Sequence, residues 1–388
     1  MATGYDELGV RRVVNAAATL TRLGGSRMPR PVVEAMAAGA EAFVDLDELQ
    51  RRAGERIASL TGNEACYVSS GAAAGIAVAV AACITGTDPA RIARLPAFEG
   101  PPAEVIVHRS HRNGYDHAAR QTGARLVEIG MAHGTQRWEL EAAIGPRTAC
   151  VLYFAGAHYA PGALPLPEVI AVAHERGVPV LVDAAAQIPP IANLRRFTCE
   201  LGADVAIFSG GKGLRGPQSS GLVLGRRDLV EACRANGTPN HSLGRPMKVG
   251  KEELLGIVAA VEWSLAQDEA ALLAGYEATV EGWLAGLQGL AGVTVERGYP
   301  SEAGQPHSRA IVRLAPPCPI SRDELVAALW DQIPRVAVGR IGGDAIALNP
   351  QTLEPGEDQL VLDALRRLLA RVPTGPDIAM ITDQNPGR

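Results

Sequence analysis

The stretch Val178-Pro-Val-Leu-Val-Asp183 is an apolar run that ends directly in a carboxylate. A continuous apolar run of this kind is typical of a strand that is buried on both faces of a sheet. Comparable strand-like runs lie at residues 105–109, 126–129, 150–154, 205–208 and 221–224. Helical stretches, such as residues 166–176, separate several of them. The alternation predicts an α/β fold in which helices cover both faces of a mostly parallel sheet.

The pattern changes after Gly244. Residues 251–290 are almost entirely helical in character, and residues 308–314 alternate like a half-buried strand. Ser321 and Glu324 have the spacing of a capping box, which favours the start of a helix at that point. This part of the chain predicts a smaller α+β domain.

The change of pattern gives predicted domain boundaries. We expect a large domain over residues 46–250 and a small domain made of residues 1–45 and 251–372. The first 45 residues are assigned to the small domain because they precede the pattern of the large one. Residues 373–388 are rich in proline and glycine, and we expect a weakly ordered tail there.

Composition and charge exclude several classes of protein. The 388 residues carry a net charge of −5, which gives no general attraction to nucleic acid. None of the six cysteines forms a Cys-x-x-Cys pair, so we expect no metal site and no disulfide framework, and a reducing, cytoplasmic setting. No signal peptide is visible, and the long apolar run at residues 71–86 is too short to span a membrane.

The segment 206–221 contains a lysine, Lys212, which lies among serines and glycines directly after an apolar run. Small neighbours leave room for a bulky group to bond to the lysine amine. A lysine at a strand end can also be desolvated, which lowers its pKa and frees a nucleophilic amine. The alternative is a glycine-rich surface turn with a solvated lysine.

Asp183 lies at the carboxyl end of its predicted strand, where ligands bind in open α/β sheets. A buried carboxylate needs a cationic partner, and the protonated ring nitrogen of a cofactor is one such partner. The small side chains of Ala184 and Ala185 would let a flat ring lie close to the backbone. The alternative is a structural aspartate that caps the next turn.

Two further features favour a phosphorylated, planar ligand. Ser70, Gly71 and Ala72 precede an Ala/Val-rich helix, and a helix start of this kind can seat a phosphate, with Ser209 as a further hydroxyl donor. His111 follows a predicted strand end, where its ring could stack on a planar cofactor. An ordinary helix cap and an exposed histidine are the alternatives, and His108, Arg109 and Tyr115 compete with His111 for the stacking position.

These features occur in the order phosphate seat, stacking residue, aspartate, lysine, which resembles the fold-type I enzymes that use pyridoxal 5′-phosphate (PLP). The closest resemblance is to the group that contains bacterial L-seryl-tRNA(Sec) selenium transferase and D-glucosaminate-6-phosphate ammonia lyase. The likeness runs from residues 12–25 through 110–116 to 348–353. Its most specific motifs are Ser209-Gly-Gly-Lys-Gly-Leu-Arg-Gly-Pro217 and Gly244-Arg-Pro-Met-Lys-Val-Gly-Lys251.

The resemblance implies a role for each predicted site residue. Lys212 would be the Schiff-base lysine and Asp183 the partner of the pyridinium nitrogen, with Ala185 beside the ring. The residues that would hold the phosphate or stack on the ring are Ser70, Gly71, Ala72, Ser209 and His111. Fold-type I architecture, a large mostly parallel domain with a smaller α+β domain, is implied as well.

The resemblance also narrows the reaction. Related cysteine desulfurases have a histidine directly before the lysine, and Gly211 stands there instead. The match begins by Arg12, which leaves no additional N-terminal domain for tRNA, and the chain is acidic. We therefore expect a lyase that removes the Cα proton, expels a Cβ hydroxyl and releases a 2-keto acid and ammonia. A racemase, an aminotransferase, a β-replacement transferase, an RNA-directed enzyme and a catalytically silent binding protein remain alternatives.

The expected substrate is an amino acid or amino-sugar acid, whose carboxylate needs a cation. Arg22, Arg215 and Arg340 are the predicted candidates, because arginine binds carboxylates through two parallel hydrogen bonds. The resemblance further implies a homodimer or a higher homo-oligomer in which residues 215–221 reach the neighbour's cofactor. We expect no membrane partner and no nucleic-acid partner.

Overall fold

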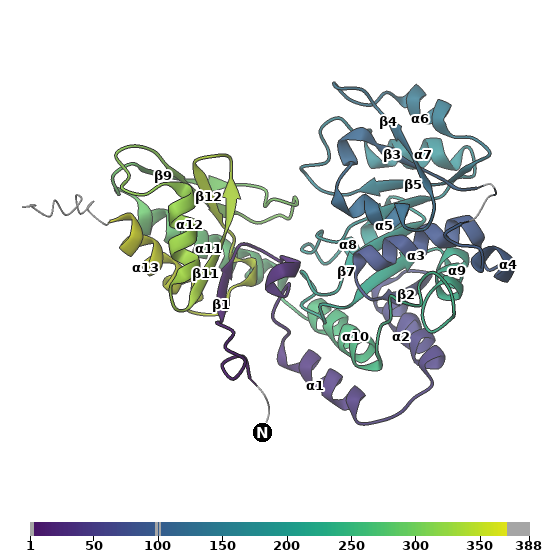
Figure 1. Cartoon of the computed structure of the whole chain (residues 1–388), viewed down its shortest axis with the longest axis horizontal. Coiled ribbons are helices and arrows are strands. Elements are labelled where there is room, and N and C mark those ends of the chain that lie inside the picture. The colour runs from purple at the N-terminus through teal and green to yellow at the C-terminus, as the bar shows by residue number, and fades with distance from the viewer. Residues whose placement is uncertain (1–3, 98–99, 101, 371–388) are drawn as a thin grey trace, which may run out of the picture. The chain divides into compact units, whose positions relative to one another are not determined.

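The computed structural model describes residues 4–97, 100 and 102–370 (Figure 1), and the tail predicted at residues 373–388 lies outside them. The chain divides into two compact units. The larger unit consists of Ala18–Glu277 and Tyr299–Ser308. The described part of the smaller unit consists of residues 4–17, 278–298 and 309–370.

The larger unit is built on a seven-stranded sheet with the order β2-β8-β7-β6-β5-β3-β4. Strand β8 is antiparallel to its neighbours β2 and β7, and the pairs from β7 to β4 are all parallel. The strands are β2 (Ala65–Ser69), β3 (Glu104–His108), β4 (Arg125–Ile129), β5 (Thr148–Phe154), β6 (Val180–Asp183), β7 (Val205–Ser209) and β8 (Gly221–Gly225). The predicted mostly parallel sheet is confirmed.

Helices cover both faces of this sheet because successive strand residues point to opposite sides. In β6, Val180 and Val182 belong to one apolar cluster, and Leu181 belongs to the other. The first cluster includes side chains of α2 (Leu46–Thr61), α7 (Leu166–His174) and α10 (Lys251–Leu265). The second includes those of α3 (Ala72–Thr85), α5 (His117–Arg120) and α9 (Arg227–Asn236). A two-sided core explains why the strands read as continuous apolar runs.

The boundary predicted at residue 46 is wrong, because residues 18–45 cluster with the larger unit. Helix α1 (Arg30–Ala40) packs along α10, and the Lys251 ammonium donates a 2.6 Å hydrogen bond to the Gly39 carbonyl. The boundary predicted at residue 251 is also too early, since α10 contributes Leu254 and Ile257 to the core of the larger unit. The amphipathic pattern of such a helix does not indicate which sheet the helix covers.

The smaller unit contains a five-stranded sheet with the order β1-β11-β12-β10-β9. Its strands are β1 (Val13–Ala16), β9 (Val293–Gly298), β10 (Arg309–Leu314), β11 (Arg335–Ile341) and β12 (Ala345–Leu348). Its helices are the second half of α11 (Glu269–Leu287), with α12 (Arg322–Asp331) and α13 (Glu357–Leu369). The capping box predicted at Ser321 and Glu324 is present at the start of α12, and the α+β class is confirmed.

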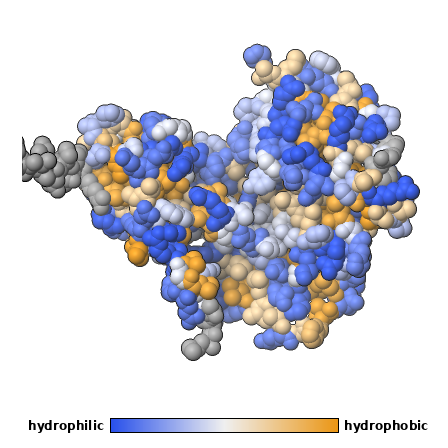
Figure 2. All heavy atoms as spheres, viewed as in Figure 1, coloured by the Kyte–Doolittle hydropathy of each residue, from blue (hydrophilic) through white to orange (hydrophobic). Residues whose placement is uncertain are grey.

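The face shown in Figure 2 mixes polar and apolar side chains, with apolar atoms over the part that α1 occupies in Figure 1. Around α1, Val33, Phe43 and Val44 are exposed apolar residues. Among the described residues, no helix has the length and apolar character needed to cross a membrane.

Candidate active site

The carboxyl ends of β2, β5, β6 and β7 meet at one edge of the sheet of the larger unit, because these strands run in the same direction. A cavity of about 380 Å³ lies at this edge, a size that suits a small organic ligand. Several segments of the larger unit form its wall, at residues 18–21, 70–73, 154–159, 183–186, 209–212 and 302–305.

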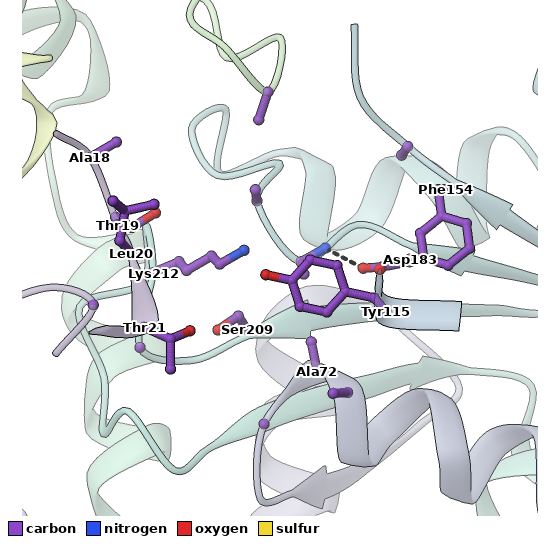
Figure 3. Close-up of a pocket in the computed structure, with 18 of the residues that line it drawn as sticks. Ala18, Thr19, Leu20, Thr21, Ala72, Tyr115, Phe154, Asp183, Ser209 and Lys212 are labelled. Atoms are coloured by element: carbon purple, nitrogen blue, oxygen red, sulfur yellow. Dashed lines mark hydrogen bonds between the residues drawn. The ribbon is translucent and has the colours of Figure 1, made fainter. Parts of the chain in front are cut away.

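Lys212 reaches into this cavity from the loop after β7 (Figure 3). Its own carbonyl accepts a 2.5 Å hydrogen bond from the Ser26 hydroxyl, which fixes the loop. A Cβ atom at Gly213 would lie 2.1 Å from the carbonyl oxygen of Ile188, so a larger residue there would displace the lysine. The chain has only three lysines, and Lys248 and Lys251 do not line the cavity.

Burial lowers the pKa of the Lys212 amine, while the negative charges of Asp183 and Glu302 act in the opposite direction. A lowered pKa gives the amine a larger neutral, nucleophilic fraction near neutral pH. The structure therefore places the Lys212 amine, whose pKa burial lowers, inside a ligand-sized cavity.

Asp183 is the last residue of β6, and its side chain is only 8% exposed. One carboxylate oxygen accepts a 2.9 Å hydrogen bond from the Ala185 amide (Figure 3). Burial raises the pKa of the Asp183 carboxyl, while that hydrogen bond and the charge of Lys212 act to lower the pKa. Among the described residues Asp183 has no ion-pair partner within 4 Å, so its carboxylate can receive a cation from a ligand.

The start of α3 provides a seat for an anion. Ser70, Gly71, Ala72 and Ala73 all line the cavity, and Ser209 faces it from the end of β7. Gly71 has φ +119°, a conformation that side-chain-bearing residues rarely adopt, and no atom lies within 4 Å of its missing Cβ. The first amide groups of a helix have no partner inside the helix and attract negative charge. The structure thus brings together all the residues predicted for the phosphate.

The segment that precedes α1 also reaches the site, but through residues other than the predicted Arg22. Thr19 and Thr21 line the cavity. The Ser26 amide donates a 2.9 Å hydrogen bond to the Gly211 carbonyl, and the Gln218 side-chain amide donates one of 2.8 Å to Thr21. For Thr19 and Thr21 the only signal in the sequence is their position inside the motif at residues 12–25, where Arg22 alone has a predicted role.

The structure does not bring His111 to the cavity wall. The residue is fully buried, and its Nδ1 accepts a 3.2 Å hydrogen bond from the Phe154 amide. Its ring lies edge-on to Tyr159, with 5.8 Å between the ring centres. Tyr115, Phe154 and Tyr159 supply the planar side chains of the cavity wall. A histidine after a strand end can turn inward as well as outward, and the sequence pattern does not distinguish the two.

The predicted arginines are not brought together at the cavity either. Arg22 is an exposed residue of a short 3-10 turn. Arg215 donates a 2.8 Å hydrogen bond to the Arg27 carbonyl, and its guanidinium lies 5.5 Å from the ring centre of Trp263. Arg340 is an exposed residue of β11 in the smaller unit. These contacts connect Arg215, in the loop that follows Lys212, to Arg27 and Trp263.

A segment from Tyr299 to Ser308, called the strap below, completes the wall with Glu302, Ala303 and Gln305. His158 also lines the cavity, and its Nδ1 lies 3.1 Å from the Glu302 backbone carbonyl. A carbonyl oxygen can only accept, so Nδ1 carries the proton in this contact. The other ring nitrogen, Nε2, takes no part in this contact.

Behind the wall, His108 and His111 lie with ring centres 4.8 Å apart. Burial lowers the pKa of His108 to about 4 and that of His111 to about 3. The unfolded chain takes up these protons below about pH 6.5, whereas the folded protein does not until the pH reaches the lowered values. Folding stability is therefore complete above pH 6.5 and falls as the pH drops towards 4.

Replacing His108 with glutamine tests this pair. The amide oxygen can still accept from the Leu164 amide, which donates a 3.2 Å hydrogen bond to His108. We expect the free energy of unfolding of the variant to fall by about 2 kcal/mol less than that of the unmodified protein between pH 7 and pH 5. Denaturant titrations at the two pH values measure this difference, and equal losses in both proteins would refute the assignment.

Known proteins with similar sequences and structures identify the family of this chain. The class-V aminotransferase family pattern matches residues 103–242. D-glucosaminate-6-phosphate ammonia lyase of Salmonella typhimurium is 34% identical over 94% of this chain and 97% of its own length. A solved structure of such a lyase has a TM-score of 0.80 at 33% identity, covering 95% of this chain and 99% of that one. This chain belongs to the D-glucosaminate-6-phosphate ammonia lyase family.

Two other relatives have names that describe different reactions. A 5′-C-glycyluridine monooxygenase-decarboxylase of a Streptomyces species is 42% identical over 66% of this chain and 64% of its own length. L-seryl-tRNA(Sec) selenium transferase of Desulfomicrobium baculatum is 28% identical over 93% of this chain and 83% of its own length. The predicted resemblance and the fold-type I architecture are confirmed, and the cofactor of the family is PLP.

The residues of the cavity fit PLP. The buried carboxylate of Asp183 suits the ring nitrogen, the start of α3 suits the phosphate and the amine of Lys212 suits the aldehyde. All three groups line one cavity of the larger unit. The site therefore offers a partner for each polar end of the cofactor.

Proposed function

We propose that this chain is a PLP-dependent ammonia lyase that acts on a 2-amino-3-hydroxy acid, either an amino acid or an amino-sugar acid. The observation that carries the proposal is the near full-length match to an ammonia lyase, together with Lys212 and Asp183 in one cavity. The products are a 2-keto acid and ammonia, and one water is lost and regained along the way.

PLP supplies an electron-poor ring that stabilises negative charge at the substrate Cα. Asp183 would hold a proton on the ring nitrogen, and its burial would strengthen that charge pairing. The start of α3 and Ser209 fix the phosphate end, which orients the ring. The amine of Lys212 takes the proton from Cα, and burial, which lowers its pKa, favours this role.

His158 is placed to help the hydroxyl group leave Cβ. Its Nδ1 proton is held by the Glu302 carbonyl, so Nε2 can carry the proton that the departing oxygen needs. Its ring centre lies 3.9 Å from that of Tyr159, which limits its rotation. Lys212, after taking the Cα proton, is the other group that can serve as this acid.

The dependence on leaving group tests His158. Chloride can leave without being protonated, whereas a hydroxyl group needs a proton in order to leave as water. Replacing His158 with glutamine should lower kcat by about 100-fold for a 3-hydroxy substrate and by much less for its 3-chloro analogue. Steady-state rates on serine and β-chloroalanine measure the two effects. Equal losses on both substrates would assign the acid to another group.

The reaction itself is tested by incubating the holoenzyme with D- and L-serine, D-glucosaminate and D-glucosaminate 6-phosphate. Release of ammonia together with an equal amount of keto acid supports the lyase. Racemised substrate, or amino transfer to an added keto acid without free ammonia, would overturn the proposal. Purified protein that takes up no PLP would favour a binding protein instead.

Oxidative decarboxylation is a second candidate, favoured by the 42% identity to the monooxygenase-decarboxylase. That likeness covers 66% of this chain, whereas the lyase covers 94%. Oxygen uptake and carbon dioxide release during the same incubations separate the two reactions. A lyase releases ammonia at the same rate with and without oxygen.

The proposal also covers the assembly of the chain, its location in the cell and the recognition of the substrate carboxylate. Exposed Val33, Phe43 and Val44 around α1 suit a homodimer or higher homo-oligomer of this chain. All six cysteines are free, which suits the cytoplasm. None of Arg22, Arg215 and Arg340 lines the cavity of the larger unit, so the cation that binds the substrate carboxylate stays a prediction.

A further inference from the structure

The strap is a rigid part of the cavity wall. The Gln187 side-chain amide donates hydrogen bonds of 2.8 Å to the Ala303 carbonyl and 3.2 Å to the Ala155 carbonyl. Within the strap, the Ser301 and His307 amides donate 3.1 Å and 2.8 Å bonds to the Gln305 carbonyl. Ser301, Gln305 and His307 are at most 2% exposed. The backbone at Gln305 is therefore fixed by bonds on several sides.

The side chain of Gln305 has one group that the protein does not satisfy. Gln305 lines the cavity, and its Oε1 is buried without a hydrogen-bond partner among the described residues. A buried acceptor without a donor destabilises a fold, so each such group calls for an explanation. Because Gln305 lines the cavity, a donor on a ligand is the explanation that its position favours. The neighbouring acceptor on the same wall is the Glu302 carboxylate, which receives a 3.0 Å hydrogen bond from the Ser301 hydroxyl.

Two hydrogen-bond acceptors on one wall of the cavity determine which kind of ligand group can bind beside them. A carboxylate or phosphate placed there would face the negative charge of Glu302 and bring no proton to Gln305. A hydroxyl group brings one proton, which it can donate to Gln305, and it carries no negative charge that Glu302 would repel. We propose that Gln305 is a specificity-determining residue whose Oε1 accepts a hydrogen bond from a hydroxyl on the substrate chain beyond Cβ. The inference rests on the proposed lyase function and names the substrate class as hydroxylated amino acids.

Gln305→Met tests the proposal, because methionine has a similar length and shape but no acceptor oxygen. The measured quantity is the ratio of kcat/KM for D-glucosaminate to kcat/KM for serine, which lacks hydroxyls beyond Cβ. We expect the ratio to fall by about 10- to 100-fold, with the rate on serine and the affinity for PLP unchanged. Gln305→Glu keeps an acceptor at the same position and should restore part of the ratio.

Thermal unfolding of the holoenzyme distinguishes recognition from a structural role. Gln305→Met removes an unsatisfied acceptor, so its Tm should stay the same or rise. The matched control is Gln187→Met, which loses two hydrogen bonds to the Ala303 and Ala155 carbonyls and should unfold at a lower temperature. A lower Tm for Gln305→Met would indicate a structural role.

The remaining outcomes separate this inference from the proposed function. An unchanged ratio in Gln305→Met would overturn the inference while leaving the lyase intact. A loss of PLP affinity would show that Gln305 serves the cofactor, which also overturns it. If the unmodified enzyme acts on neither compound, the lyase proposal fails. In that case D-glucosaminate should still raise the Tm of the unmodified holoenzyme more than that of Gln305→Met, and equal shifts would overturn the inference.

Discussion

Replacing Lys212 with alanine should abolish the visible absorbance of protein-bound PLP and lower lyase turnover by about 1,000-fold or more. The variant loses both the amine that bonds to the cofactor aldehyde and the group that takes the Cα proton, and a positioned base alone contributes about 100- to 10,000-fold. Lys212 is the sole lysine of this chain among the residues that line the cavity. Absorbance after dialysis and steady-state ammonia release measure the two losses.

Lys248 provides the matched control. It is exposed and does not line the cavity, so Lys248→Ala should keep both the absorbance and the activity. Activity that survives in Lys212→Ala at more than a few per cent would remove the lysine from the reaction. A loss in both variants would indicate an effect on folding, which circular dichroism of each protein checks.

Replacing Asp183 with asparagine should keep PLP attached to Lys212 but lower turnover by about 100-fold or more. Asparagine has the same shape and no charge, so it cannot hold the proton on the ring nitrogen. Each unit by which the aspartate raises the pKa of that nitrogen corresponds to about 1.4 kcal/mol of differential stabilisation. Turnover and the absorbance of the bound cofactor are measured on the same sample. Near-normal turnover would mean that another group pairs with the ring.

The same substitution should affect folding stability in the opposite direction to its effect on turnover. Burial raises the pKa of Asp183, so the folded protein without cofactor holds a proton that the unfolded chain releases above about pH 4. The stability that depends on this proton is lost as the pH rises. Asparagine does not titrate, so the variant does not lose stability in this way. The cofactor-free variant should therefore melt no lower than the cofactor-free parent at pH 7. A marked destabilisation would show that the carboxylate has a structural partner.

Much of the larger unit could be predicted because its strands are buried on both faces. That burial produces apolar runs such as residues 178–182, and a charge at the end of a run, as at Asp183, marks the edge where ligands bind. Lys212 and the start of α3 follow from the same logic, since each comes directly after a strand. The pattern is local, so the sequence exposes it.

The rest of the site depends on contacts between residues far apart in the chain. The strap reaches the cavity through the bond from Gln187 to Ala303, which spans 116 residues. The Ser26 hydroxyl reaches Lys212 across 186 residues. Neither segment has a composition that marks it. His111 and Arg215 do not line the cavity, and their hydrogen bonds to Phe154 and Arg27 likewise join residues far apart in the chain. Such contacts are set by packing, which local pattern does not encode.

Peptide mapping after borohydride reduction tests the central claim most directly. The reagent makes the bond between PLP and its lysine permanent, and the chain offers only Lys212, Lys248 and Lys251 as side-chain targets. Lys251 is held by the Gly39 carbonyl and Glu252, and Lys248 is exposed. The site predicts a single modified peptide, with the pyridoxyl group on Lys212. Modification of Lys248 or Lys251 instead, or of no lysine in protein that has bound PLP, would contradict the assignment of this cavity as the active site.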